Sequence, residues 1–136
     1  MSERNKSVAR RAMQEVWNQG NAAAADELYA RDYLAHTGDG DLHGPHQFMQ
    51  YLSEFRQSFP DLEFKIEDVI GEGDRVGVRW TGRGTHTGEF EGLPATGKKC
   101  VATGFTFFRI AGGKIVEDWG NWDRLGLMQQ LGAIPA

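Results

Sequence analysis

The stretch that decides the fold is "FRIAGGKIVEDW", residues 108–119, which has the pattern of two strands joined by a tight turn. Gly112 and Gly113 stand at its centre, and glycine suits a hairpin turn because it adopts positive φ without strain. Successive side chains of a strand point to opposite faces of a sheet. The stretch therefore predicts an antiparallel hairpin whose strands cover residues 100–110 and 114–121.

The rest of the second half continues this pattern. Apolar residues alternate with charged ones over 62–67, which predicts a half-buried strand. "GEGD", residues 71–74, is typical of a hairpin turn, and residues 75–86 form a long strand after it. A glycine-rich loop over 87–99 then leads into the central hairpin.

The first half has helical spacing instead. An apolar stripe runs over 8–17, and a short helix over 22–29 follows with Asn21 as its N-cap. A third helix begins at Gly44-Pro45 and ends before Pro60. After the strands, Asp123 is expected to cap a last amphipathic segment.

Helices followed by a run of strands indicate an α+β fold. Three helices of this length cannot cover both faces of a sheet with strands this long. We therefore expect a strongly curved, mixed or antiparallel sheet that wraps around three N-terminal helices and leaves a cone with an open mouth. The whole chain, residues 1–136, is expected to form this one domain.

Composition narrows the classes of function. The net charge of −4, without a cluster of Lys or Arg, argues against a nucleic-acid surface. No run of about eighteen apolar residues is present, so a membrane span is not expected. The absence of a secretory signal pattern and the single cysteine, Cys100, indicate a cytoplasmic protein in which that thiol is an inert packing residue.

Motifs over most of the chain resemble one known family. They are "EVWNQGN", "LYARDYLAH", "GDRVGVRWTGRGTHTGEFEGLPATGKK", the central hairpin and "DRLGLMQQLG". In order and spacing they resemble the SnoaL-like polyketide (ester) cyclases. The resemblance implies the cone-shaped fold of nuclear transport factor two, ketosteroid isomerase and scytalone dehydratase. It also implies ring closure by intramolecular aldol condensation without metal or cofactor.

The resemblance also aligns the family's catalytic positions with this chain. The acid/base aspartate of the founding cyclases corresponds to Gly120. A supporting histidine and glutamine correspond to Thr106 and Gly104. None of the three residue types is kept, so the fold inference stands while the specific aldol-cyclase inference is not supported.

Asp118 is the remaining candidate acid/base. If Gly120 faces the cone, alternation places Asp118 there too, with Thr106 and Phe108 on the neighbouring strand. Glu117 then faces outward. Burial in an apolar cone disfavours a charged carboxylate and raises its pKa toward values useful for proton transfer. The alternative is that Asp118 is a structural residue, hydrogen-bonded to a buried partner or placed at the rim.

Residues 36–46, "HTGDGDLHGPH", hold three histidines and two aspartates. Their spacing matches no compact metal motif, so a solvated loop is the stronger interpretation and no metal site is assigned. His36 follows "DYLA", which leads into the cavity in the related fold, and could pair with Asp118 as a polar helper. The alternative is a half-exposed loop histidine.

The predicted cavity has an aromatic wall suited to a flat or cyclic apolar ligand. The 87–99 loop either closes its mouth or is a plain connection. The residues expected to contact the ligand are Trp17, Tyr33, Tyr51, Phe55, Trp80, His86, Phe90, Leu93, Phe108 and Trp122.

These features predict an acid/base enzyme without metal or cofactor, acting on a small apolar carbonyl compound through Asp118, with His36 or Thr106 assisting. The alternative is a binding module of the same fold that performs no chemistry. Phe105, Phe107 and Trp119 fall on the outward face by alternation, and large apolar residues there indicate a partner. The resemblance implies that this partner is a second copy of the chain, bound through the sheet.

Overall fold

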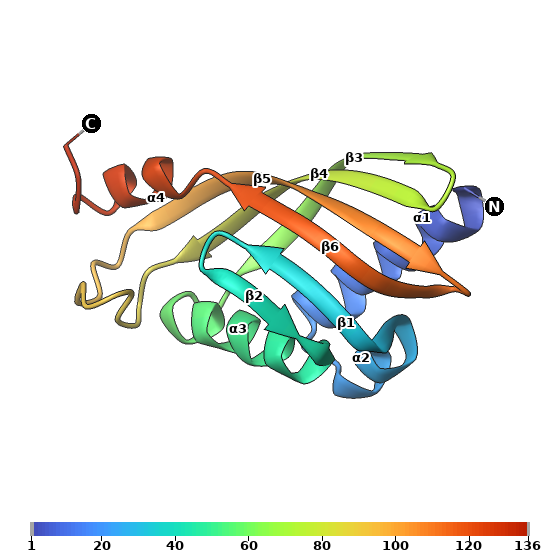
Figure 1. Cartoon of the computed structure of the whole chain (residues 1–136). Coiled ribbons are helices and arrows are strands. Elements are labelled where there is room, and N and C mark those ends of the chain that lie inside the picture. Colours follow the sequence, from blue (N-terminus) through green and yellow to red (C-terminus); the bar gives the residue numbers. More distant parts are fainter. Residues whose placement is uncertain (1, 136) are drawn as a thin grey trace.

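A curved sheet wraps around the N-terminal helices in the computed structural model, which describes residues 2–135 (Figure 1). Within these residues the sheet has six strands in the order β2-β1-β6-β5-β4-β3. All neighbours are antiparallel except β1 and β6, which are parallel. The strands are β1 (Tyr29–Thr37), β2 (Gly40–His43), β3 (Glu63–Glu72), β4 (Arg75–Thr85), β5 (Lys99–Ala111) and β6 (Lys114–Trp122). The predicted α+β class and mixed sheet are confirmed.

The helices lie close to their predicted positions. They are α1 (Ser2–Arg11), its π-helical continuation η1 (Ala12–Asn18), α2 (Ala22–Leu28), α3 (Gly44–Ser58) and α4 (Arg124–Gln130). The Asn21 side chain caps α2 by accepting a hydrogen bond from the Ala24 amide at 3.1 Å. Asp123 caps α4 in the same way from the Gly126 amide at 2.8 Å. Both predicted caps are confirmed.

Residues 29–43 differ from the prediction. The sequence pattern indicated a helix end followed by a solvated loop, but the chain forms β1, a turn and β2 here. The strand β1 is irregular, because its register against β6 shifts between Tyr29 and Leu34. That shift breaks the simple alternation by which strands are recognised. Its pairing partner, β6, also lies about eighty residues further along the chain, so local pattern carries no trace of the contact.

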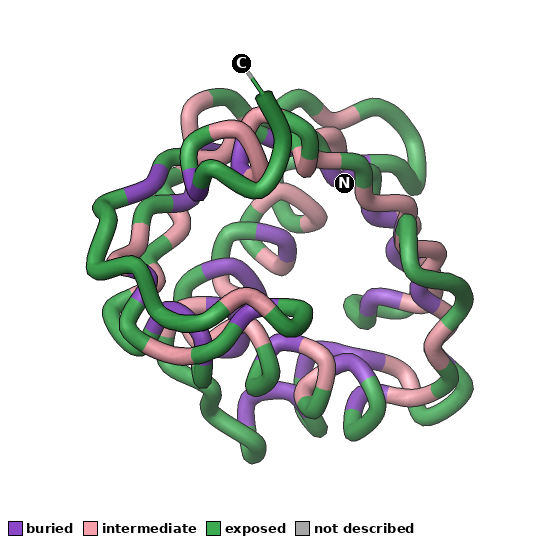
Figure 2. The backbone as a smooth tube through the Cα atoms, turned by 90° about the vertical axis from the view of Figure 1, so that its left-hand side faces the viewer, coloured by how far each residue is buried: buried purple, intermediate pink, exposed green. Residues whose placement is uncertain are grey.

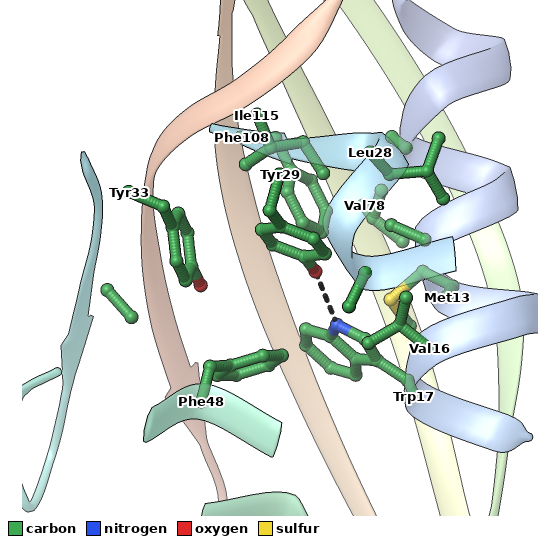
Figure 3. Packing of buried hydrophobic residues seen from close by; sticks show 14 of the residues in the cluster. Met13, Val16, Trp17, Leu28, Tyr29, Tyr33, Phe48, Val78, Phe108 and Ile115 are labelled. Carbon is green, nitrogen blue, oxygen red and sulfur yellow. Dashed lines mark hydrogen bonds between the residues drawn. The ribbon is translucent and has the colours of Figure 1, made fainter. Parts of the chain in front are cut away.

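The core fills the space between the helices and the concave face of the sheet. Figure 2 shows that buried positions recur at short intervals along both helices and strands. Trp17 of η1 stands at its centre and donates a hydrogen bond from Nε1 to the hydroxyl of Tyr29 at 3.1 Å (Figure 3). The rings of Tyr33 and Phe48 pack beside this pair. The indole and phenol are therefore buried without leaving these polar atoms unpaired.

The two faces of β5 and β6 separate as alternation predicts. Thr106 and Phe108 are buried, whereas Phe105 is 61% exposed and Phe107 is 58% exposed on the convex face. Trp119 also faces outward, but its ring is half-covered, because His36 stacks on it at 5.3 Å and Arg75 lies over it. In the described residues, no helix combines the length and apolar character needed to cross a membrane.

Candidate functional site

An apolar cavity lies between the helices and the concave face of the sheet. Its wall is mostly aromatic and aliphatic, and its polar side chains include those of Asp118, Thr106, His36 and Asn121. Five predicted contact residues line it, namely Trp17, Tyr51, Phe55, Trp80 and Trp122. Phe48, Leu52, Phe59 and Phe64 line it as well and were not predicted as contacts. Such a cavity, apolar with few polar groups, is typical of a small-molecule site.

Asp118 is the acid of this cavity. Its side chain is 3% exposed, and its Oδ2 atom accepts a hydrogen bond from the Tyr33 hydroxyl at 2.6 Å. Burial raises the pKa of Asp118 from 3.8 to about 7, although the Tyr33 hydrogen bond acts in the opposite direction by stabilising the carboxylate. A carboxyl group that exchanges its proton near neutral pH is suited to general acid/base chemistry.

Tyr33 reaches Asp118 because β1 lies parallel to β6. The register pairs Ala35 with Asp118, so the side chain of Tyr33, two residues earlier, falls on the same inner face. Burial raises the pKa of Tyr33 well above 10, and the nearby Asp118 charge raises it further. Tyr33 therefore stays protonated and acts as a hydrogen-bond donor. The sequence analysis had placed Tyr33 against the ligand, whereas its hydroxyl contacts the acid.

Thr106 is held by a neighbouring indole. The Nε1 atom of Trp80 donates to Thr106 Oγ1 at 3.1 Å, so the threonine hydroxyl uses its oxygen as an acceptor and keeps its proton for another partner. Trp80 occupies this position only because residue 104 is glycine. A Cβ atom there would lie 2.3 Å from Trp80 Cζ2. The indole thus fills the space in which a side chain at position 104 would stand.

Gly120 lies directly opposite Thr106 in the antiparallel pairing of β5 and β6. A Cβ atom added to Gly120 would find only one neighbour within 4 Å, Thr106 Oγ1 at 3.8 Å. The position of the family's catalytic aspartate, as the resemblance places it, is therefore open space bordered by the cavity. Asp118 is the preceding inward-facing position on the same strand, two residues before Gly120.

His36 does not reach Asp118, and the predicted pairing of the two is absent. His36 pairs in register with Trp119, which faces outward. Its Nε2 lies 2.6 Å from Glu117 Oε2, and its Nδ1 lies 3.1 Å from Asp41 Oδ1. These carboxylates raise the pKa of His36, with Glu117 the larger cause. Tyr33 takes the place at Asp118 that the sequence analysis had assigned to His36.

Five predicted ligand contacts lie outside the cavity lining: Tyr33, His86, Phe90, Leu93 and Phe108. Phe108 and Tyr33 belong to the packed core. His86 is fully buried against the ring of Phe59, with Nδ1 2.9 Å from Thr96 Oγ1. Phe90 and Leu93 pair through their backbones and pack in a second apolar cluster near α4. The 87–99 segment therefore supports the wall from behind.

Side chains able to bind a metal do not gather in the described part of the chain, where no group of three His, Cys, Asp or Glu has suitable geometry. The histidines of residues 36–46 are spread apart. His36 faces Glu117 and Asp41, while His46 lies 3.6 Å from Asp26 on an exposed surface.

Comparison with known proteins agrees with this geometry. The family model of the SnoaL-like polyketide cyclases matches residues 7–131. The chain belongs to this family. Among its curated relatives are two aklanonic acid methyl ester cyclases. DauD from Streptomyces sp. (strain C5) is 31% identical over 90% of this chain and 78% of its own length. DnrD from Streptomyces peucetius is 31% identical over 90% of this chain and 87% of its own length.

Solved structures of this family superpose closely on the chain. IdmH from Streptomyces antibioticus has a TM-score of 0.85 with 29% identity, covering 94% of this chain and 98% of its own. A protein from Acidithiobacillus ferrooxidans has a TM-score of 0.86 with 32% identity, covering 98% of this chain and 97% of its own. The cone-shaped SnoaL-like fold that the sequence motifs implied is thereby confirmed.

Proposed function

We propose that this chain is an acid/base enzyme of the cyclase type, in which Asp118 moves a proton next to a carbonyl group of a flat apolar molecule. One observation carries the proposal. An aspartate at the inner end of an aromatic cavity has a pKa of about 7 and is held by a tyrosine hydroxyl. A base with a pKa near the working pH combines a large ionised fraction with useful proton affinity.

The chemistry assigns each group a task. Tyr33 engages Oδ2 of Asp118, which leaves Oδ1 to face the ligand. Oδ1 takes a proton from the carbon beside the carbonyl group. The electron pair of that C–H bond forms a C=C bond, and the π pair of the carbonyl group moves onto its oxygen. The resulting enolate carbon then bonds to a second carbonyl carbon of the same molecule. The alkoxide formed there takes the proton back from Asp118, so the ring closes without net gain or loss of protons.

Thr106 is placed to stabilise the enolate oxygen. It stands on β5 diagonally across from Asp118, because Phe108 is the residue directly opposite Asp118 and Thr106 is two residues away on the same face. Diagonal side chains on one face of a sheet are about 7–8 Å apart at the backbone, so one ligand can contact both. The hydroxyl oriented by Trp80 supplies the hydrogen bond where negative charge develops.

The curated relatives support this substrate class. Two of them are named for closing a ring in aklanonic acid methyl ester, and a third is the nogalonic acid methyl ester cyclase of Streptomyces nogalater. The aromatic lining of the present cavity suits a flat, fused-ring carbonyl compound of that kind. The acid, however, stands at position 118 in this chain and not at Gly120.

The test is proton exchange at carbon in a simple fused-ring ketone. In D₂O, the wild-type protein should catalyse exchange of the acidic C1 protons of 2-tetralone, followed by NMR. Asp118→Asn keeps the size of the side chain but removes the base, and should lower the catalysed exchange about a thousandfold. Thr106→Val should lower it about tenfold or more, since it removes one donor to the oxyanion. Exchange catalysed by Asp118→Asn at a rate close to that of the wild type would exclude Asp118 as the base.

A binding module without chemistry is the second candidate. Glycine at positions 104 and 120 and threonine at 106 favour it, because the three catalytic side chains implied by the family resemblance are missing. Trp17, Trp80 and Trp122 line the cavity, so tryptophan fluorescence reports on ligand binding independently of turnover. A 2-tetralone that quenches this fluorescence but exchanges its protons no faster than in buffer would favour the binding module.

We also propose that a second copy of the chain covers the convex face of β5 and β6. The exposed rings of Phe105 and Phe107 support this, because monomers seldom leave aromatic side chains so uncovered on a sheet. Trp119 borders them, half-covered by His36 and Arg75. Analytical ultracentrifugation should find a dimer at micromolar concentration, and a monomer there would contradict the proposal.

A further inference from the structure

A second hollow adjoins the cavity beside Gly120. It is lined by Gly38, Asp39, Gly120, Asn121, Trp122 and Arg124. Four of these six residues also line the main cavity, namely Gly38, Gly120, Asn121 and Trp122. The two spaces therefore share a border that runs along the strand at Gly120. Besides a carboxylate, from Asp39, the second hollow holds a guanidinium, from Arg124, which the cavity lacks.

The charged side chains of the second hollow already have partners in the chain. Arg124 forms ion pairs through its Nη2 with Glu91 and through its Nη1 with Asp39 Oδ1, the latter at 3.6 Å. Asp39 Oδ2 also accepts a hydrogen bond from the Tyr51 hydroxyl at 2.9 Å. An added anion would meet two carboxylates and an added cation would meet the guanidinium. The hollow therefore suits a neutral group that both donates and accepts hydrogen bonds.

The contact between Arg124 and Asp39 leaves room for such a group. At 3.6 Å, Nη1 and Oδ1 are further apart than the 2.7–3.2 Å of a normal N–H···O hydrogen bond. A hydroxyl group placed beside both atoms would accept a hydrogen bond from Nη1 and donate one to Oδ1. Two aromatic rings hold the guanidinium in place, since it lies 5.9 Å from the ring centroid of Trp122 and 5.8 Å from that of Phe90.

Gly120 determines whether a ligand can extend from one space to the other. Its inner face meets only Thr106 Oγ1, at 3.8 Å from an added Cβ atom. A β-branched side chain at this position would project into the shared border between the two hollows. The glycine that stands at the family's aspartate position is therefore an opening in this chain.

We infer that the ligand is amphipathic: an apolar ring system fills the cavity, and a hydroxyl-bearing arm passes Gly120 to bridge Arg124 and Asp39. This inference rests on the proposed function, because it extends the ligand bound beside Asp118. Arg124 and Asp39 act in specificity, by selecting ligands with a hydroxyl group at that distance from the ring. Tyr51 holds the carboxylate of Asp39 in the orientation that receives the hydroxyl.

Two pairs of ligands of equal size test the inference by calorimetric titration. One pair is 6-(2-hydroxyethoxy)-2-tetralone and 6-propoxy-2-tetralone, which differ only in a terminal hydroxyl or methyl group. The shorter pair is 6-hydroxy-2-tetralone and 6-methyl-2-tetralone. In at least one pair, the wild-type protein should bind the hydroxylated compound about tenfold more tightly, as expected for hydrogen bonds to charged groups. Affinity ratios near one in both pairs would overturn the inference.

Substitutions test whether this affinity ratio arises at Arg124 and Asp39. Arg124→Gln and Asp39→Asn should each bring the affinity ratio close to one, and Gly120→Val should do so while unsubstituted 2-tetralone still binds. Glu91→Gln is the matched control, because it removes the other ion pair of Arg124 and leaves the hydroxyl site intact, so the ratio should persist. A ratio unchanged by both Arg124→Gln and Gly120→Val would overturn the inference. Thermal unfolding of each variant checks that it is folded.

The same titrations separate this inference from the proposed function. Asp118→Asn removes the base but not the hydroxyl site, so its affinity ratio should equal that of the wild type. A protein that prefers the hydroxylated ligand but exchanges no protons would contradict the enzymatic proposal alone. A protein that exchanges protons without this preference would contradict the hydroxyl site alone.

Discussion

Glu117 and Asp118 are neighbours in sequence and have the same functional group, yet they lie in opposite environments. Glu117 points to the convex face, where His36 and Arg109 hold its pKa below the usual value, with His36 the larger cause. Asp118 points into the cavity, where burial raises its pKa to about 7. Because the strand alternates its side chains between the two faces, a carboxyl group with a lowered pKa stands directly next to one with a raised pKa.

The different pKa values of these two carboxyl groups come from their surroundings on the two faces of the sheet. Outside, the carboxylate is compensated by cations and serves structure. Inside, a single tyrosine hydroxyl is its hydrogen-bond donor, which is not enough to offset the loss of water. Equal substitutions at the two positions should therefore have very different effects.

The largest expected difference is catalytic. Asp118→Asn should lower kcat/KM for ketone exchange by a factor of about a thousand, within the range attributed to general acid/base groups. Glu117→Gln should change it less than about threefold, because Glu117 faces away from the cavity. Steady-state rates of deuterium incorporation measure both. Equal losses in the two variants would mean that the inner and outer faces are not functionally distinct.

The next largest effect is expected on dimerisation, from a substitution on the convex face of the sheet. Phe107→Glu places a charge on the proposed dimer surface and should weaken association by at least about a hundredfold, because a buried unpaired charge is strongly unfavourable. Phe107→Leu is the apolar control and should remain dimeric. Sedimentation velocity at micromolar concentration reports the change. A Phe107→Glu variant that sediments like the wild type would contradict the assignment of this surface.

Stability should depend on pH through Asp118. Its native pKa of about 7 lies above the unfolded value of 3.8, so the native state binds more protons between these values. The free energy of unfolding should therefore fall as pH rises through this window, by about 2–3 kcal/mol between pH 5 and pH 8 for this one group. Asp118→Asn lacks this contribution. Urea unfolding at both pH values should find that the stability of Asp118→Asn relative to wild type increases by roughly that difference between pH 5 and pH 8.

A smaller effect is expected from the hydrogen bond between Tyr33 and Asp118. Tyr33→Phe removes a donor to the carboxylate, which destabilises the charged form and raises the pKa of Asp118 further above 7. The ascending limb of the plot of kcat/KM against pH should move toward higher pH by about one unit. This shift corresponds to the free energy of one hydrogen bond to a charged group. A profile that moves downward would indicate that Tyr33 contacts the protonated carboxyl instead.

The family resemblance and alternation along β5 and β6 together predicted the site's central features from sequence. The resemblance placed Gly120 on the cone-facing side, and alternation from that residue placed Asp118 and Thr106 inside and Phe105 and Phe107 outside. Alternation relates residues that are close together in the chain, so no distant contact had to be known. Trp80 was assigned to the wall for the same reason, since it stands on the inward face of β4.

The predictions that were wrong concern residues whose positions depend on contacts between segments distant in the sequence. β1 pairs with β6 through an irregular register, and this pairing decides that Tyr33 reaches Asp118 while His36 turns to Glu117. Tyr33 and His36 are three residues apart, so alternation along β1 points their side chains to opposite faces once this segment forms a strand, which the sequence pattern did not predict. His86 and Phe90 were predicted to contact the ligand, but both pack against Phe59 behind the cavity wall. No local sequence pattern indicates these contacts.

The most direct test of the central claim is the titration of the two neighbouring carboxyl groups in one sample. With ¹³C-labelled protein, the side-chain carboxyl shifts of Asp118 and Glu117 can be followed by NMR as pH is raised. The structure predicts a midpoint near pH 7 for Asp118 and one below 4.5 for Glu117. A midpoint for Asp118 near its ordinary 3.8 would show that the cavity does not raise its pKa, and would contradict its role as the base.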